Sequence, residues 1–367
     1  MTKIYFDHNA TTNIEPQALQ AMVKMFELPI NDSSIHHFGQ IGKKVVLDAK
    51  KALDDLLNAS AFKVIFTSCG SEANNQAIFG FDDFKIATSF NEHDSVLQAA
   101  KMCDHVIIKT TKDGLLDLDD LQQNLAEIKG NFLVSLTFAN NETGILQDVK
   151  KAAQITHKYG GIFHCDLTQG VGKCEIDLEK LNIDLATISG HKFGAPMGVG
   201  ALLIRQNIDL KPLIYGGGQQ QNLRSGTLNI PAIAGFEKAC IKAQENLNKA
   251  KKIQELRDLL EKSLIEICQE NIVIFGQNQK RLPNTSYFGV KGLDSQMMVI
   301  KFDLNSILLS SGSACSSGTS KESKILKVMD IDPDFIKGAM RISLSKNNTK
   351  KELEEFLAIF KEIYLQK

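Results

Sequence analysis

The sequence lacks the features that mark exported and membrane-bound chains. Its start, "MTKIYFDHNATT", has no basic region followed by a long apolar stretch, so it does not resemble a signal peptide. No window is apolar over the length that a membrane-spanning helix needs. We therefore expect a cytoplasmic protein that has no membrane partner.

A strong charge of either sign is also absent. The chain has 42 Lys and Arg against 43 Asp and Glu, a formal net charge of -1, and its basic residues are spread along the sequence. A protein whose main partner is nucleic acid or an anionic membrane would concentrate positive charge on one surface. We expect neither partner.

The seven cysteines form no disulfide or metal pattern, because they are scattered and no CxxC pair occurs. Reduced thiols and no structural metal site are the expectation. Cys315 is unusual among them. It lies in "SSGSACSSG", residues 310–318, whose small residues predict a loop, whereas cysteine is usually a core residue. A thiol on a loop calls for a chemical explanation.

The 367 residues are 43% hydrophobic and 23% charged, which allows a large core and more than one domain. Short apolar runs alternate with helical patterns through most of the chain. For example, "KVIFTS" predicts a strand and the following "SEANNQAIFGF" a helix. This alternation predicts an α/β fold with a mostly parallel sheet covered by helices.

The pattern changes near Pro231. Residues 231–267 predict one long helix with Pro231 in its first turn, and short strands and closing helices follow. We expect a large domain at residues 13–250. A smaller α+β domain would combine residues 1–12 and 251–367 and carry the cysteine loop, about residues 310–323.

Polar residues follow several predicted strands. Lys192 comes three residues after "LATIS", Asp166 ends "GIFHCD", and Gly70 and Ser71 join a strand to a helix. Open α/β sheets bind ligands at the carboxyl ends of their strands, and helix starts bind anions. A lysine for an aldehyde, an aspartate for a pyridinium and a phosphate cradle together indicate pyridoxal phosphate.

Each of these signals has an ordinary alternative when it is taken alone. Lys192 could be a solvated charge, Asp166 a turn residue, and the Gly70–Ser71 junction a plain strand-to-helix connection. His93 could stack on the cofactor ring and Asn141 bind its phenolic oxygen, but both residue types are also common in loops and turns. Their order along one α/β domain favours the cofactor.

Nearly the whole chain resembles the cysteine desulfurases of the NifS and IscS type. These form part of the class V branch of fold type I pyridoxal-phosphate enzymes. The resemblance rests on the following stretches: "YFDHNATT", "FTSCGSEANN", "NEHDSVL", "NNETG", "HCDLTQGVGK", "SGHKFGAPMGVGAL", "GGGQQQNLRSGT" and "SSGSACSSG".

The resemblance implies a role for each cofactor residue. Lys192 would carry the cofactor and take the substrate Cα proton, Asp166 would hold the ring nitrogen, and His93 would stack on the ring. Two residues would bind the phenolic oxygen and four the phosphate: Asn141 and Gln169, and Gly70, Ser71, Ser189 and His191.

It also implies a substrate and a partner chain. Asn31 and Arg341 match residues that grip the carboxylate of L-cysteine, a task that suits the planar fork of arginine. Thr227 matches a residue that reaches the phosphate of the neighbouring subunit, so we expect a homodimer with shared active sites.

The resemblance explains the loop cysteine as well. Cys315 would take sulfur from L-cysteine as a persulfide, leave L-alanine, and pass the sulfur to an acceptor such as an iron–sulfur scaffold. A mobile loop can both collect and deliver the sulfur. No resident metal is expected, although Cys315 could be a transient iron–sulfur ligand during transfer. We expect its thiolate to form near cationic groups such as His93.

Two alternatives remain open at this point. A selenocysteine lyase, or another class V aminotransferase or lyase, would use the same cofactor residues. A docking protein of an iron–sulfur assembly complex would have lost catalysis altogether. The chain departs from the usual family pattern at Asp32, Cys69, Gln221 and residues 321–323. Cys69 should leave the phosphate cradle intact unless its backbone needs a positive φ.

Overall fold

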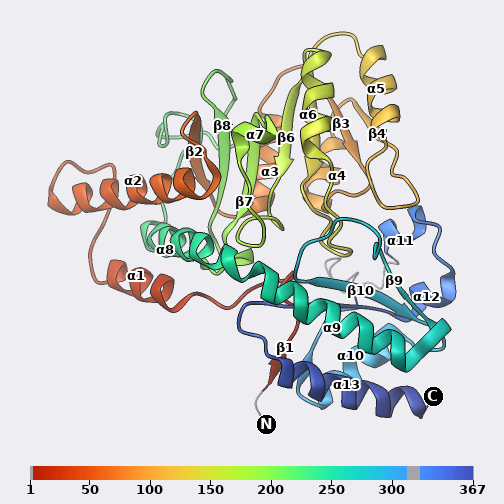
Figure 1. Ribbon diagram of the computed structural model, residues 1–367. Coiled ribbons are helices and arrows are strands. Elements are labelled where there is room, and N and C mark those ends of the chain that lie inside the picture. The colour runs from red at the N-terminus through yellow and green to blue at the C-terminus, as the bar shows by residue number, and fades with distance from the viewer. Residues whose placement is uncertain (1–2, 312–322, 367) are drawn as a thin grey trace.

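The computed structural model describes residues 3–311 and 323–366. A seven-stranded sheet lies at its centre, in the order β2-β8-β7-β6-β5-β3-β4 (Figure 1). Strand β8 runs antiparallel to both of its neighbours, and the other pairs are parallel. The predicted α/β fold with a mostly parallel sheet is confirmed. The strands are β2 (Phe62–Thr67), β3 (Lys85–Ser89), β4 (His105–Ile108), β5 (Phe132–Thr137), β6 (Ile162–Asp166), β7 (Leu185–Ser189) and β8 (Gly200–Arg205).

Helices bury both faces of this sheet. Successive side chains of a strand point to opposite faces, so Val64 and Phe66 of β2 pack on one side with α2, α5, α6 and α8. Ile65 packs on the other side with α3 and α4. The helices of this part are α1 (Pro16–Phe26), α2 (His37–Leu57), α3 (Gly70–Phe79), α4 (Asp94–Ala100), α5 (Leu118–Glu127), α6 (Val149–Lys158), α7 (Leu178–Leu181) and α8 (Ile230–Asn246).

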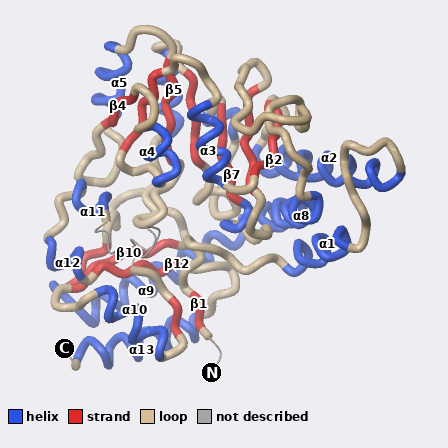
Figure 2. Tube along the Cα trace, turned by 180° about the vertical axis from the view of Figure 1, so that it is seen from behind, coloured by secondary structure: helices blue, strands red, loops and turns tan. Residues whose placement is uncertain are grey.

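A second apolar core forms around a small antiparallel sheet of order β12-β10-β9. Phe288, Phe302 and Phe356 pack there together with Phe6 from the N-terminal segment. The first and the last described segments of the chain lie beside this core (Figure 2). The elements of this core are β1 (Ile4–Tyr5), α9 (Ala250–Cys268), β9 (Ile272–Ile274), β10 (Thr285–Val290), α10 (Ser295–Leu304), β11 (Ile307–Leu308), β12 (Ala339–Ser343) and α13 (Lys350–Leu365). Helices α11 (Lys324–Val328) and α12 (Pro333–Lys337) pack in a separate, smaller cluster with Tyr287 of β10.

The expected single helix from Pro231 is interrupted by a short 3-10 turn, Leu247–Lys249, between α8 and α9. The backbone stays right-handed through the turn. Asparagine side chains compete for backbone hydrogen bonds and form helix poorly, and Asn246 and Asn248 flank Leu247. The helix therefore tightens here without a proline or glycine.

The packing partners of this helical rod change at the same turn. Ala243 belongs to the core beneath the large sheet, whereas Leu256 belongs to the second core. The N-terminal residues Ile4 and Phe6 also belong to the second core. On this basis we keep the division near residue 250, with residues 1–12 in the smaller unit, as a proposal.

No helix within residues 3–311 and 323–366 is both long and apolar enough to span a membrane. Within the same residues, no group of three His, Cys, Asp or Glu side chains is arranged to hold a metal ion. The six cysteines that the structure describes are free thiols.

Candidate active site

A pocket of about 270 Å³ lies where strands β5, β6 and β7 end and helix α3 begins. Parallel strands bring the residues that follow them to one edge of the sheet, so separate motifs meet there. The predicted residues that line it are Gly70, Ser71, His93, Asn141, Asp166, Gln169, Ser189, His191 and Lys192. Cys69, Asn74, Ser95, Thr137, Ala139 and Thr168 complete the lining.

Asp166 is the last residue of β6, and only 4% of it is exposed. Its Oδ2 accepts a hydrogen bond of 2.8 Å from Asn74 Nδ2, and its Oδ1 accepts one of 2.9 Å from the backbone N–H of Thr168. These donors orient the carboxylate at the edge of the pocket. The arrangement suits a partner that brings an N–H to the aspartate.

Glu92 is buried near this carboxylate. Burial raises the pKa of Glu92 from 4.5 to about 8, and the negative charge of Asp166 adds to the rise. Its Oε1 accepts a hydrogen bond of 3.0 Å from Ser89 Oγ. Glu92 is therefore mostly protonated at neutral pH, which avoids a second negative charge beside Asp166.

Lys192 follows β7 in a short 3-10 turn, Gly190–Lys192. Its Nζ donates hydrogen bonds of 2.7 Å to the carbonyl oxygens of Asn9 and Ala10. The adjacent His191 shares a hydrogen bond of 3.1 Å with Thr11 Oγ1. Burial, followed by the charge of Lys192, lowers the pKa of His191 to about 4, so this imidazole is neutral at physiological pH. The N-terminal segment thus holds the lysine in place.

Helix α3 begins at Gly70, directly at the pocket. The first N–H groups of a helix have no partner within it and attract anions. A Cβ at Gly70 would come within 3.1 Å of Ser189 Cβ and 3.3 Å of Thr168 Oγ1, so glycine keeps this approach open. Cys69 has an extended backbone, with φ -170, which any residue adopts. Cys69 therefore needs no positive φ, which is the condition stated above for an intact phosphate cradle.

Asn9, which was not among the predicted site residues, connects the pocket with strand β10 of the smaller sheet. The carbonyl oxygen of Asn9 accepts the hydrogen bond from Lys192 Nζ and a second one, of 3.1 Å, from Gln169 Nε2. Its side-chain Nδ2 donates one of 2.9 Å to Thr285 Oγ1, and its Oδ1 accepts one of 3.1 Å from Asn284 Nδ2. The signal that could have identified it was its place in "YFDHNATT".

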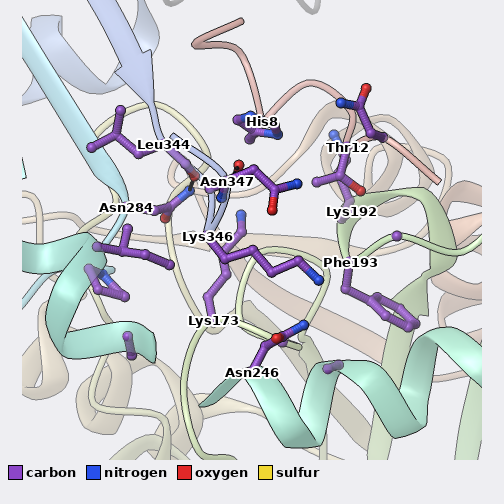
Figure 3. A pocket seen from close by; sticks show the side chains of 18 of the residues that line it. His8, Thr12, Lys173, Lys192, Phe193, Asn246, Asn284, Leu344, Lys346 and Asn347 are labelled. Atoms are coloured by element: carbon purple, nitrogen blue, oxygen red, sulfur yellow. Dashed lines mark hydrogen bonds between the residues drawn. The ribbon is translucent and has the colours of Figure 1, made fainter. Parts of the chain in front are cut away.

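Lys173 is a second missed residue, although it lies within the motif "HCDLTQGVGK". Its Nζ donates hydrogen bonds of 2.6 Å to Gln169 Oε1 and 3.0 Å to Asn9 Oδ1. Burial, followed by the charge of Lys192, lowers the pKa of Lys173 from 10.5 to about 7. Figure 3 shows Lys173, Lys192 and Lys346 around a smaller cavity of about 90 Å³.

Arg341 lies next to the pocket but does not line it. Its side chain is 1% exposed on β12, where Nη2 donates a hydrogen bond of 2.6 Å to Asp7 Oδ1. Nη1 donates one of 3.0 Å to the carbonyl oxygen of Asn141, a pocket residue. The Nε atom is buried and has no hydrogen-bond partner within the described residues.

Other predicted residues lie away from this pocket. Asn31 is exposed in the connection between α1 and α2, where its Oδ1 accepts a hydrogen bond from the backbone of Ser33. Thr227 is exposed in the segment before α8. Cys315 and the departures at Lys321 and Glu322 fall outside the described residues. The predictions made for all of these residues stay predictions.

The structure shows the surroundings of two further departures, Gln221 and Ser323. Gln221 has a positive φ of 63, between Gln220 and Asn222, which are also left-handed. The side chain of Gln220 bonds both backbone groups of Phe66 and ties this turn to β2. Ser323, in the "KES" departure, accepts a hydrogen bond from Leu326 N at the start of α11.

The residues of the pocket fit pyridoxal phosphate. Asp166 offers an oriented carboxylate to a protonated ring nitrogen, and the start of α3 offers N–H groups to a phosphate. Lys192 offers an amine at the same pocket. A lysine for the aldehyde, an acidic partner for the pyridinium nitrogen and an anion cradle for the phosphate are the groups that pyridoxal phosphate requires.

The comparisons with known proteins agree with this arrangement. Residues 4–356 match the family described as class V aminotransferases. The chain is 36% identical to a protein named cysteine desulfurase 2 from Trichormus variabilis, over 99% of this chain and 93% of the relative. It is 32% identical to a cysteine desulfurase IscS from Dictyoglomus turgidum, over 98% and 94%. The solved structure of a NifS-like protein from Rickettsia africae superposes with a TM-score of 0.92 at 37% identity, over 99% of both chains. The chain belongs to the class V aminotransferase family.

Proposed function

We propose that this chain is a pyridoxal-phosphate-dependent cysteine desulfurase, which removes sulfur from L-cysteine and leaves L-alanine. The observation that carries the proposal is the meeting of Lys192, Asp166 and the start of α3 in one pocket. Relatives that share about a third of their residues with the chain bear the same activity in their names.

The pocket residues divide the work of holding the cofactor. Lys192 would bind the aldehyde, Asp166 would keep the ring nitrogen protonated, and His93 would stack on the ring. Two sets of residues would hold the phenolic oxygen and the phosphate: Asn141 and Gln169, and Gly70, Ser71, Ser189 and His191. When bound, the cofactor supplies an electron sink for the substrate Cα.

Lys192 then takes the Cα proton of the substrate. Its two hydrogen-bond acceptors, the carbonyls of Asn9 and Ala10, hold the amine on the strand-end side of the pocket. Arg341 would bind the substrate carboxylate together with Asn31. Arg341 Nη1 bonds the carbonyl oxygen of Asn141, a pocket residue, and Nε has no hydrogen-bond partner within the described residues, so the guanidinium keeps a donor for this task.

Cys315 receives the sulfur as a persulfide and carries it to an acceptor protein, such as an iron–sulfur scaffold. We further propose a cytoplasmic homodimer in which Thr227 reaches the neighbouring active site. Cys315→Ser should abolish sulfide release from cysteine, whereas the matched control Cys103→Ser, at a partly buried free thiol, should retain it. Mass spectrometry of the loop peptide after incubation with cysteine should detect one added sulfur atom on Cys315.

The same experiments separate the alternatives. A class V aminotransferase or a lyase without sulfur chemistry would keep its activity in Cys315→Ser. A selenocysteine lyase would turn over selenocysteine far faster than cysteine. A docking protein without catalysis would be colourless, whereas the proposed enzyme is yellow and borohydride traps its cofactor on Lys192. A colourless protein, or full sulfide release without Cys315, would overturn the proposal.

A further inference from the structure

A chain of hydrogen bonds connects Asp166 with His93 through Asn74 and Ser95, which lie within the motifs "FTSCGSEANN" and "NEHDSVL" but were given no role above. Asn74 Nδ2 donates to Asp166 Oδ2 at 2.8 Å and to Ser95 Oγ at 2.9 Å. Ser95 Oγ lies 2.8 Å from His93 Nδ1, and the backbone N–H of Ser95 donates to the same ring nitrogen at 3.1 Å. Asn74 comes from α3 and Ser95 from α4, helices that pack on the same face of the sheet.

The chemistry of the groups determines the direction of each bond. A carboxylate only accepts, so the atom of Asn74 that faces Asp166 is the amide nitrogen, which donates. A backbone N–H only donates, so His93 Nδ1 must be the acceptor and carries no proton. The hydroxyl of Ser95 accepts from Asn74, which leaves its own hydrogen to be donated to His93 Nδ1.

We propose that Asn74 and Ser95 are positioning residues that hold His93 as the tautomer protonated on Nε2 and couple its orientation to Asp166. The inference rests on the roles proposed above for Asp166 and His93. His93 is the N-cap of α4, and a proton on Nδ1 would face the N–H of Ser95 and break this cap. The ring therefore carries its proton on Nε2, which stays a donor.

The amide oxygen of Asn74 supports a functional reading of this chain. Asn74 is 1% exposed, and its Oδ1 is buried without a hydrogen-bond partner within the described residues. An unpaired buried acceptor lowers stability. An apolar side chain would fill this space without leaving a buried acceptor unpaired. Only an amide, however, can donate to both Asp166 and Ser95, which accounts for asparagine at this position.

The test uses the full chain labelled with ¹⁵N-histidine, both without and with pyridoxal phosphate. Two-bond ¹⁵N–¹H spectra distinguish the ring tautomers, and His93→Gln assigns the signals of His93. The variants are Ser95→Ala, Ser95→Thr, Asn74→Ala and the double alanine variant. If Asn74→Ala does not fold, Asn74→Ser takes its place. The serine side chain is polar but too short to bond both Asp166 and Ser95.

We expect the Nε2-protonated tautomer in the wild type, with Nδ1 hydrogen-bonded. The loss of one hydrogen bond changes an equilibrium about fivefold. Ser95→Ala should therefore lower the ratio of the Nε2-protonated to the Nδ1-protonated tautomer of His93 about fivefold. Ser95→Thr should restore the wild-type signals. Asn74→Ala should move the Nδ1 signal in the same direction without touching His93, and the double variant should match Ser95→Ala.

An Nδ1-protonated ring in the wild type would overturn the proposal. An Nδ1 signal that does not change in Asn74→Ala would also overturn it. So would a shift in the double variant that equals the sum of the two single-variant shifts, because either single substitution already interrupts the chain of hydrogen bonds. The spectra require no turnover. The spectra therefore test the positioning role of Asn74 and Ser95 separately from the sulfide assay, which tests the proposed function. Either experiment can fail without affecting the result of the other.

Discussion

Replacing Glu92 by glutamine tests the electrostatics beside Asp166 with almost no change in side-chain size. Glu92 is buried, and its pKa is raised from 4.5 to about 8 by burial and, second, by the charge of Asp166. In the unfolded chain the carboxyl has its ordinary pKa. Between these two values the native protein binds more protons than the unfolded one, so wild-type stability falls as the pH rises.

The magnitude follows from the displacement. Each pH unit between the two pKa values corresponds to about 1.4 kcal/mol, so the move from 4.5 to about 8 costs at most about 5 kcal/mol above pH 8. At pH 7 the cost is on the order of 3 kcal/mol. Glu92→Gln cannot ionise and avoids this cost. We expect its stability relative to wild type to increase by several kcal/mol from about pH 5 to about pH 9.

Urea unfolding of the cofactor-free protein, followed by circular dichroism across this pH range, provides the measurement. Asp166 and other titrating groups are common to both proteins and cancel in the difference. Glu354→Gln, at an exposed position of α13, is the matched control and should follow the wild-type curve. If the difference between Glu92→Gln and wild type is independent of pH, Glu92 is ionised in the native protein and our account of this carboxylate is wrong.

Three further predictions concern the same region. Burial and the charge of Lys192 lower the pKa of Lys173 from 10.5 to about 7, so wild-type stability should rise with pH between these values. Urea unfolding of Lys173→Met should lose this rise; an unchanged rise would mean that Lys173 is not its source. Asp7→Asn removes the carboxylate partner of the buried Arg341 and should cost about 3 kcal/mol of unfolding free energy. Asp330→Asn, in the exposed pair with Lys112, should cause no measurable loss in the same assay, and equal losses would refute the role of burial. Gly70→Ala places a Cβ 3.1 Å from Ser189 Cβ, and equilibrium dialysis should detect weaker retention of pyridoxal phosphate by up to about tenfold. Undiminished retention would show that the start of α3 does not need this space.

The main elements of the fold follow from local patterns that a sequence reveals. The apolar runs "KVIFTS" and "LATIS" form β2 and β7, whose residues are almost all buried. Strand β7 lies inside the sheet, and β2 at the sheet edge has helices packed on both of its faces. The place of the pocket follows as well, since Asp166 and Lys192 end or follow neighbouring strands whose carboxyl ends share one edge. The 3-10 turn at Leu247–Lys249 was not predicted, because both flanking segments have a strong helical pattern.

The role of the loop cysteine rests on sequence resemblance alone, since Cys315 lies outside the described residues. The predicted task of Thr227 depends on a second chain, and neither Thr227 nor Asn31 lines the pocket described here. By contrast, the predicted cofactor residues come together in one pocket because they follow neighbouring strands of a single sheet.

The sequence by itself determined the secondary structure, the family and the cofactor chemistry, because these depend on residue types at fixed spacings along the chain. The tertiary structure decided which groups are charged and which donate. Asn9 joins Lys192 to strand β10 of the smaller sheet, Glu92 is protonated, and His93 accepts at Nδ1. Each of these facts depends on burial and on donors from elements far apart in sequence, which no local pattern specifies.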